Sequence, residues 1–446
     1  MERRYSSCAR FLPTFVAVGS STVRSPWAKA RAVVPANGTP GWGRNTSVVR
    51  PRQGTLRNFK FQISNFKFLS AGLPAAVLLV STMPAFAQAP SQPYAVLPRD
   101  AVSYSGPGRD AAHDLKGSEI KIGFLAPLTG SHQNDGKALL EAAQMAVEDE
   151  AASPLPEGQR MVIVPRDQSG PWGRASSEIV QFIYGDQAVA IITSLDGASA
   201  HLAEQVANKV GIPLVTLSSD PTTTKINLPW IFRLGPTDAQ QARAFARDIF
   251  VERKLKQVVL ITEDDHDGRV GGDEFQRAAR GLNVPHAAQL TIDPADAKLD
   301  SVIAQIMASK PEALVFWTEY DFAARLDVQL RKAFPTTPIY LCHQAAQGRF
   351  DSGNFWTVKP RLAGGPLRES FENRYRARTG TVPVPAAAQA YDAVRILAAA
   401  LRRSGSNRAR LRDALAALSN YTGLSGAVAF DHAGNDVSDV TLVRFP

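Results

Sequence analysis

Short apolar runs alternate with amphipathic helical patterns from residue 118 to the end of this 446-residue chain, and this alternation limits the folds open to it. The first run, 120–126, ends at Pro127, and a helical pattern with one apolar face follows over 136–150. Runs such as 189–193 are apolar throughout, as expected of strands that helices cover on both faces. The alternation therefore predicts an α/β fold with parallel sheets and helices on both sides.

The same pattern locates the individual elements. We expect strands at 120–126, 160–165, 188–193, 213–217, 230–234, 257–262, 285–291, 312–317 and 338–342, and helices at 136–150, 175–185, 199–210, 239–253, 270–281, 299–309, 321–333, 367–378, 386–403 and 407–417. An α/β region of this length exceeds what one hydrophobic core usually supports, so two lobes are expected. We therefore predict two doubly wound parallel-sheet lobes.

The positive charge of the chain lies in its first part. The formal net charge is +9, but 12 of the 50 Lys and Arg residues and only one of the 41 acidic residues precede position 88. The remainder carries 38 basic and 40 acidic residues. This near balance gives no support for nucleic-acid binding by the folded region.

Residues 58–87 have the three parts of a secretory signal peptide. Lys60 and Lys67 supply the positive region, 69–80 is apolar but too short to span a bilayer, and Ala85-Phe-Ala87 is a small-x-small cleavage site. Cleavage would start the mature chain at Gln88 and deliver it to the periplasm. An uncleaved membrane anchor is the alternative interpretation.

The regions on either side of this signal show little periodicity. Residues 1–57 are rich in Arg, Ser, Pro and Gly, and we interpret them as a non-native extension from a wrongly chosen start codon or as a disordered extension. Residues 88–117 contain several Pro, Gly and Ser residues, so we expect a linker there. Only Cys342 would remain after cleavage, so the mature chain can form no internal disulfide.

Several segments, taken in order along the chain, resemble motifs of one known family. Besides the opening strand and turn at 118–130, they are 210–221 (G-I-P-x-(I/V)-S-x-(A/S)-(S/T)-(D/N)-P), 230–234 ((Y/W)-x-F-R), 371–380 (F-x-x-x-Y-x-x-x-x-G), 391–397 (Y-D-A-V) and 423–434 (G-x-x-G-x-x-x-F-D-x-x-G). The family is that of the type I periplasmic solute-binding proteins, the Leu/Ile/Val-binding family of ABC importers. The resemblance covers 118–446 and rests on the order and spacing of these motifs.

The resemblance implies two lobes joined by crossing hinge strands, with a ligand held in the cleft and enclosed by hinge bending. Lobe one would comprise 118–237 plus 366–405, and lobe two 238–365 plus 406–446. The function implied is the periplasmic substrate-binding component of an ABC importer for amino acids or related small polar solutes. A ligand-sensing receptor subunit of the same fold is the alternative.

The resemblance also implies ligand contacts in lobe one, each with a structural alternative. The loop after the first strand contributes Thr129 and Asn134, although relatives often carry an aromatic residue near the second position. The loop after the third strand contributes Ser194, Asp196 and Ser199, whose hydroxyls and neighbouring N–H groups suit a carboxylate. Ser199 could instead simply cap the following helix. The pair Ser218 and Ser219 matches residues that grip the polar head of the ligand, or forms a turn before Asp220-Pro221.

In lobe two, the implied contacts depart from the family pattern. Asp267 stands where many relatives carry Tyr, and it could accept hydrogen bonds from a ligand amine or lie in a solvated acidic loop. Glu319 and Tyr320 follow the next strand and could reach the cleft. Gln344 stands where relatives that bind amino acids often have Glu, which weakens the case for a standard branched-chain amino acid.

Motifs for catalysis were searched for without success. The chain has no G-x-S-x-G elbow, no H-E-x-x-H and no paired C-x-x-C, so we expect no enzyme, no cofactor and no metal. His266 among Asp264, Asp265 and Asp267 could hold a metal ion, but such a loop is more often solvated charge. The expected partners are a small ligand (an amino acid, an amide or a short organic acid) and the permease subunits of the importer, with the chain itself a monomer.

Overall fold

The structure is a computed structural model, and it describes residues 115, 117–171, 173–225, 228–284, 287–293, 299–350, 353–361, 364–419 and 421–445. The expected extension 1–57, the signal peptide 58–87 and nearly all of the linker 88–117 lie outside the described residues. Within these described ranges, no helix is both long and apolar enough to cross a membrane.

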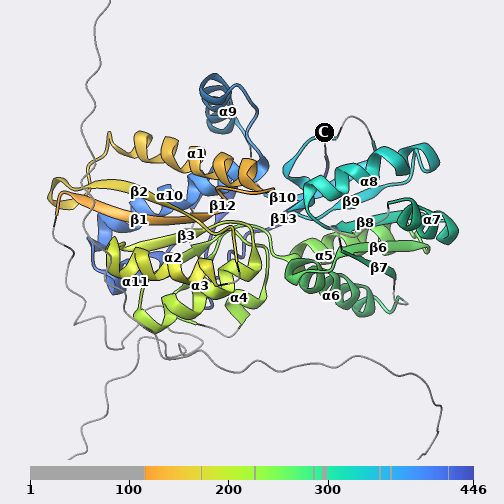
Figure 1. The fold of residues 1–446 in the computed structure, drawn as a ribbon, viewed down its shortest axis with the longest axis horizontal. Coiled ribbons are helices and arrows are strands. Elements are labelled where there is room, and N and C mark those ends of the chain that lie inside the picture. The colour runs from red at the N-terminus through yellow and green to blue at the C-terminus, as the bar shows by residue number, and fades with distance from the viewer. Residues whose placement is uncertain are drawn as a thin grey trace, which may run out of the picture. The chain divides into compact units, whose positions relative to one another are not determined.

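The first of two large sheets has five parallel strands in the order β2-β1-β3-β4-β5. Its strands are β1 (Glu119–Ala126), β2 (Arg160–Asp167), β3 (Ala190–Thr193), β4 (Leu214–Thr216) and β5 (Ile231–Arg233). Helices α1 (Gln133–Glu150) and α2 (Arg174–Val180) lie on opposite sides of β1, as Figure 1 shows. Alternate β1 residues accordingly enter different cores: Phe124 packs in the cluster with α1, and Leu125 in the cluster with α2.

Two further helices complete this lobe. Helix α3 (Gly197–Val210) joins α2 on one face, and the long helix α10 (Pro385–Ser404) joins α1 on the other. Helix α9 (Pro366–Thr379) is tied to α1 by three ion pairs: Arg374 meets Asp149 at 2.6 Å, and Arg378 meets both Glu148, at 2.7 Å, and Glu141. Segments far apart in the sequence thus build one lobe.

The second sheet has six strands in the order β13-β10-β9-β8-β6-β7. They are β6 (Val258–Glu263), β7 (Ala288–Ile292), β8 (Ala313–Trp317), β9 (Ile339–Leu341), β10 (Phe355–Pro360) and β13 (Val440–Arg444). Helices α5 (Asp238–Ala246), α6 (His266–Gly281), α7 (Leu299–Ser309) and α8 (Tyr320–Ala333) cover it. Neighbouring strands of this sheet pair in parallel except β10 with β13, so the sheet carries one antiparallel edge strand.

The predicted α/β class with two parallel-sheet lobes is confirmed, and all nine expected strands and ten expected helices are present. The sequence analysis missed strands β10, β11 (Tyr421–Gly423), β12 (Gly426–Val428) and β13, together with the short helix α4 (Thr222–Lys225). These pieces are short or only partly buried, so they lack the continuous apolar run that marks a covered strand.

One lobe boundary differs from the expected one. Residues 406–446 were assigned to lobe two, but helix α11 (Arg408–Ala416) and strand β12 place Leu411, Leu415 and Val428 in the core of the first sheet. Only the final stretch joins the second sheet, where β13 pairs with β10. The apolar side chains of α11 face α10, and this burial assigns the segment to lobe one.

The chain passes between the lobes at three places: after β5, after β10 and before β13. The first and third crossings run side by side, because the Arg233 N–H donates to the Gly434 carbonyl at 2.8 Å and the Asp436 N–H donates to the Arg233 carbonyl at 3.0 Å. At Gly434, φ is +80° and a Cβ would lie 1.9 Å from the Ile231 carbonyl oxygen, so only glycine allows this close approach.

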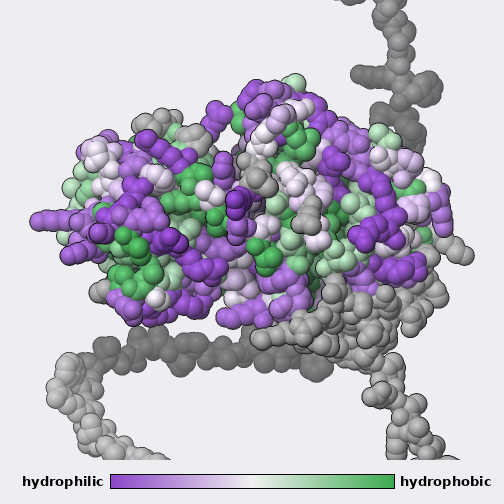
Figure 2. Space-filling view, turned by 180° about the vertical axis from the view of Figure 1, so that it is seen from behind, coloured by the Kyte–Doolittle hydropathy of each residue, from purple (hydrophilic) through white to green (hydrophobic). Residues whose placement is uncertain are grey.

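The outer surface is mixed. On the face seen in Figure 2, hydrophilic residues predominate and hydrophobic ones form small scattered patches. The large apolar side chains that are exposed come from separate elements, among them Tyr184 after α2, Met307 on α7 and Leu367 on α9. Such scattered apolar residues are normal on a protein surface.

Candidate functional site

The N-terminus of one helix from each lobe lies in the candidate site. Helix α3 of lobe one begins with Asp196 as its N-cap, and helix α6 of lobe two begins with Asp265 as its N-cap. Each carboxylate accepts a hydrogen bond from a backbone N–H in the first turn of its helix, which fixes where that helix starts. Both helices follow the carboxyl end of a parallel strand, which is the edge where α/β folds bind ligands.

The predicted serine loop of lobe one forms a chain of side-chain hydrogen bonds. Ser194 donates to the Gln168 side-chain oxygen at 2.8 Å, and the Gln168 amide donates to Asp196 at 3.0 Å. The Ser199 hydroxyl also donates to Asp196. The helix cap is therefore Asp196 and not Ser199, and the sequence analysis missed Gln168, which links two of the predicted residues.

Ser218 and Ser219 are both buried beyond the end of β4. The Ser218 hydroxyl accepts a hydrogen bond from the Asp220 N–H at 3.2 Å. The Ser219 carbonyl accepts from the Asp238 N–H at 2.9 Å, and its hydroxyl hydrogen-bonds the Asp238 carboxyl group. The pair therefore combines the expected turn with a contact to the first crossing segment, where α5 begins.

Asp267 and Gln344 connect lobe two to the first turn of α3. The Asp267 carboxylate accepts hydrogen bonds from the Gly197 N–H at 3.1 Å and from the Gln344 amide at 2.7 Å. Its other oxygen is shielded from solvent and has no hydrogen-bond partner. Burial, with Asp196 close by, raises the pKa of Asp267 to about 8. Asp267 thus lies against lobe one and not in a solvated loop.

Further carboxyl groups lie around this contact. Burial raises the pKa of Glu319 well above its ordinary value, with Glu263 and Asp267 adding to the effect. Burial also raises the pKa of Glu263 to about 7 and that of Asp135, on α1, above its usual range. The His132 imidazole lies close to Glu319, with its Nδ1 4.0 Å from a Glu319 oxygen. The site therefore holds more carboxylate than cation to balance it.

The remaining predicted residues lie at the margins. Thr129 is exposed and donates to Asp167 at 2.6 Å. Asn134 is exposed in the first turn of α1, and its side chain forms no hydrogen bond with the residues that the structure describes. Tyr320 donates to the Arg349 carbonyl at 2.6 Å and packs edge-on against Phe350, so its hydroxyl serves the loop after β9.

A cluster of His201, Asp220 and His266 also bridges the lobes, and none of the three was among the predicted site residues. Asp220 hydrogen-bonds both imidazoles. The contacts of its ring nitrogens with the Asp220 and Glu204 carboxylates raise the pKa of His201 to about 10. His201 lies inside a helical pattern and gave no sequence signal, whereas His266 and Asp220 were noticed and interpreted as surface and turn residues.

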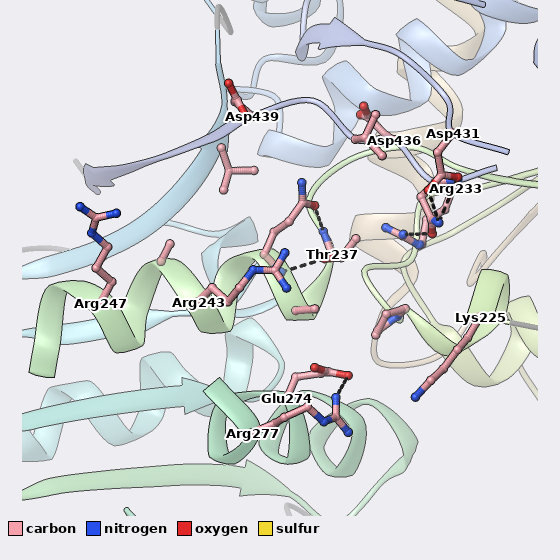
Figure 3. Close-up of a pocket in the computed structure, with 17 residues that line it drawn as sticks. Lys225, Arg233, Thr237, Arg243, Arg247, Glu274, Arg277, Asp431, Asp436 and Asp439 are labelled. Carbon is pink, nitrogen blue, oxygen red and sulfur yellow. Dashed lines mark hydrogen bonds and ion pairs between the residues drawn. The ribbon is translucent and has the colours of Figure 1, made fainter. Parts of the chain in front are cut away.

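A separate cavity of about 750 Å³ lies beside the first and third crossing segments, and Figure 3 shows its lining. None of the eleven predicted residues lines it. Lys225 and Arg243 extend toward it, and Arg277 pairs with Glu274. Its lining carries charges of both signs and comes mainly from the crossing segments, α5 and α6, without any residue of the first turn of α3 or of α6.

Comparisons with known proteins agree with this architecture. The family described as "Periplasmic binding protein" matches residues 119–444. The chain is 24% identical over 302 residues to an "Amino acid binding protein" of Pseudomonas aeruginosa, covering 65% of this chain and 80% of that protein. It is 23% identical over 304 residues to a Leu/Ile/Val-binding protein of Rhizobium johnstonii, covering 66% of this chain and 81% of that one.

Solved structures of similar fold include the branched-chain amino acid transporter substrate-binding protein LivJ from Streptococcus pneumoniae in complex with isoleucine. Its TM-score is 0.65 at 22% identity, covering 73% of this chain and 96% of that one. A solute-binding protein of an ABC transporter from R. palustris, in complex with benzoate, gives a TM-score of 0.64 at 19% identity, covering 74% and 93%.

Proposed function

Since the chain belongs to the periplasmic binding protein family, we propose that it is the solute-binding component of an ABC importer and that its lobes close around an amino acid or a related small polar solute. The choice of ligand rests on one observation. At the interlobe contact, a hydrogen-bond donor of lobe one, the Gly197 N–H, faces a carboxyl group of lobe two, that of Asp267. Proteins of similar fold hold isoleucine in one case and benzoate in another. Both of those ligands carry a carboxylate.

The lobe-one face suits an anion. The Gly197 N–H stands at the start of α3, where the helix dipole favours negative charge, and here it receives the Asp267 carboxylate. A ligand carboxylate would take over this N–H. Asp267 occupies the same position from within the chain, so ligand entry requires its side chain to turn away.

The lobe-two face suits a cation. The Asp267 carboxyl group is packed against lobe one and Glu319 is 34% exposed; both have raised pKa values, and a ligand ammonium group would favour their ionised forms. A zwitterionic amino acid satisfies both faces at once, because its carboxylate meets α3 and its ammonium group meets the displaced Asp267. Gln344, beside Asp267, can donate to the same carboxylate.

The test is calorimetric titration of the chain from Gln88 onward, after a thermal-shift screen of the amino acids identifies the best ligand. The amide derivative lacks the carboxylate, and the hydroxy acid lacks the ammonium group. Each should bind roughly 10–100-fold more weakly, since a hydrogen bond to a charged group contributes about 1.5–3 kcal/mol. Equal binding of both derivatives, or no stabilisation by any amino acid, would refute the zwitterion site.

The remaining parts of the proposal concern the cell. We expect export to the periplasm with cleavage before Gln88, which N-terminal sequencing of the exported protein checks. The partners would be permease subunits, and the chain would act as a monomer that performs no chemistry. Ligand recovered unchanged after incubation, and import that depends on this gene, are the corresponding observations.

A further inference from the structure

Three side chains from both lobes converge on one point beside the solute site. His201 comes from the second turn of α3, Asp220 from the loop after β4, and His266 from the first residue of α6. The Nε2 atoms of the two histidines lie 3.0 and 2.7 Å from the same Asp220 oxygen. One potential ligand atom from each residue lies within 4.8 Å of the other two. The lobes therefore share a compact set of nitrogen and oxygen donors.

A second carboxylate, that of Glu204, contacts the His201 imidazole on the Nδ1 side, away from Asp220. The Nδ1 of His201 lies 2.9 Å from an oxygen of Glu204, which is only 3% exposed. This carboxylate lies beside Nδ1 while Nε2 points toward Asp220, and a bound ion would replace the proton that Nε2 shares with Asp220. Carboxylate–histidine pairs of this kind orient histidine ligands in zinc sites.

Asp220 is held in a similar way. One of its oxygens accepts hydrogen bonds from the Thr222 N–H and from the Thr222 hydroxyl, both at 2.7 Å. The other oxygen faces the two imidazoles. The carboxylate thus presents one free ligand atom in a fixed direction.

We propose that His201, Asp220 and His266 form a binding site for a divalent transition-metal ion of the zinc type, and that the ion fastens the two lobes together. Two imidazoles and one carboxylate are a ligand set that zinc accepts at about 2.0–2.2 Å per bond. Ligand atoms of a tetrahedral ion with such bonds lie about 3.3 Å apart. The observed 2.7 and 3.0 Å separations would open by only a few tenths of an ångström.

The exposure of the histidines to solvent and the number of protein ligands are also consistent with a zinc site. The side chains of His201 and His266 are 29% and 34% exposed, so an ion can enter from solvent. Three protein ligands leave a fourth position for water. Because the ligands come from both lobes, an ion bound by all three favours the joined lobes, and by linkage it should raise solute affinity.

The experiment uses the chain from Gln88 onward, stripped with a chelator and titrated with zinc chloride against a chromophoric competitor. We expect one ion per chain at neutral pH, and at least tenfold weaker binding in His201→Ala and in His266→Ala. His432→Ala is the matched control, because His432 is exposed and lies outside the cluster. It should bind zinc as the wild type does.

Two further measurements keep the test decisive. Glu204→Gln should weaken zinc binding by roughly 10–100-fold with circular dichroism unchanged, as for other residues that orient a ligand. Cobalt(II) bound to the wild type should give the visible spectrum of a four-coordinate nitrogen–oxygen site. Zinc binding that survives in both His201→Ala and His266→Ala, or no binding at micromolar zinc, would overturn the proposal.

Discussion

Lobe one meets the solute site with polar groups that already satisfy one another, whereas lobe two meets it with carboxyl groups that have few partners. In lobe one, Ser194, Gln168, Asp196 and Ser199 form a closed hydrogen-bond chain. In lobe two, one oxygen of Asp267 has no partner and is shielded from solvent. A fully bonded network is rigid, but a shielded carboxyl group is costly until a cation meets it.

This contrast suggests a division of work. In the proposed mode of binding, lobe one would receive the anionic end of a solute, and lobe two would supply the negative charge that a solute must complement. The interlobe bond from the Gly197 N–H to Asp267 shows that the two faces also complement each other. Substitutions at the Gly197–Asp267 contact should therefore change the affinity for the solute. Substitutions of the buried residues behind this contact should change the free energy of unfolding.

The largest effect is expected from Gly197→Ala. A Cβ at this position would lie 2.2 Å from an Asp267 oxygen, 3.1 Å from the His266 ring and 3.2 Å from the Asp220 Cβ, so the lobes could not approach as closely even after Asp267 turns away. Solute affinity should fall by more than about 100-fold, roughly 3 kcal/mol, as measured by calorimetry. The control is Gly281→Ala on α6, where a Cβ would have no atom within 4 Å. Unchanged affinity in the first variant would disprove the close interlobe contact.

Asp267→Asn tests the role of the negative charge on the lobe-two face, because the Asn side chain has nearly the same shape as that of Asp. The amide cannot balance a ligand ammonium group, so affinity should fall by roughly 10–100-fold, in line with about 1.5–3 kcal/mol for a charged hydrogen bond. Asp264→Asn is the matched control, because Asp264 is 60% exposed and pairs only with the equally exposed Arg269. Equal loss in both variants would mean that the charge of the loop, and not a contact by Asp267, matters.

Ser219→Ala distinguishes a role of Ser219 in ligand binding from a role in stabilising the first crossing segment. The hydroxyl bonds the buried Asp238 carboxyl group, so its removal should lower the unfolding free energy by about 1–2 kcal/mol, measured by urea denaturation. If the hydroxyl also contacts the ligand, affinity should fall by roughly 1–3 kcal/mol. A variant with wild-type stability and wild-type affinity would remove Ser219 from both roles.

The smallest effect, counted per pH unit, concerns pH. Burial raises the pKa of Asp238 to about 7, well above the ordinary value of 3.8. Between these values the folded protein holds a proton that the unfolded chain has lost, so this group makes stability fall as pH rises from about 4 to 7, by at most about 1.4 kcal/mol per pH unit. Asp238→Asn should flatten that slope in urea denaturation series at several pH values. An unchanged slope would assign it to other groups.

Much of the fold could be predicted because its strands are buried on both faces. Strand β1 was expected at 120–126 and spans Glu119–Ala126. Helix α1 begins three residues earlier than expected, at Gln133, because its first turn is polar and its apolar periodicity starts only at Leu139. Strand β13 was missed because it is half exposed and is defined by its antiparallel pairing with β10, which lies 80 or more residues earlier in the sequence.

Residues of the candidate site could be predicted from the sequence only where they directly follow a predicted strand. Ser194 and Gln344 follow predicted strands, and the structure places both at the interlobe contact. Tyr320 also follows a strand, yet its hydroxyl turns to the Arg349 carbonyl. Position at the sheet edge can be inferred from sequence, but the direction of a side chain depends on the packing around it.

The sequence by itself determined the α/β class, the two lobes and the loops at which a solute would be held, because hydrophobic periodicity records which residues are buried. Only the tertiary structure decided that Asp267 reaches Gly197 and that His201 and His266 share Asp220. These partners lie 19 to 70 residues apart along the chain, and no local pattern encodes their distance. They meet because the packing of the two lobes brings the N-termini of α3 and α6 together.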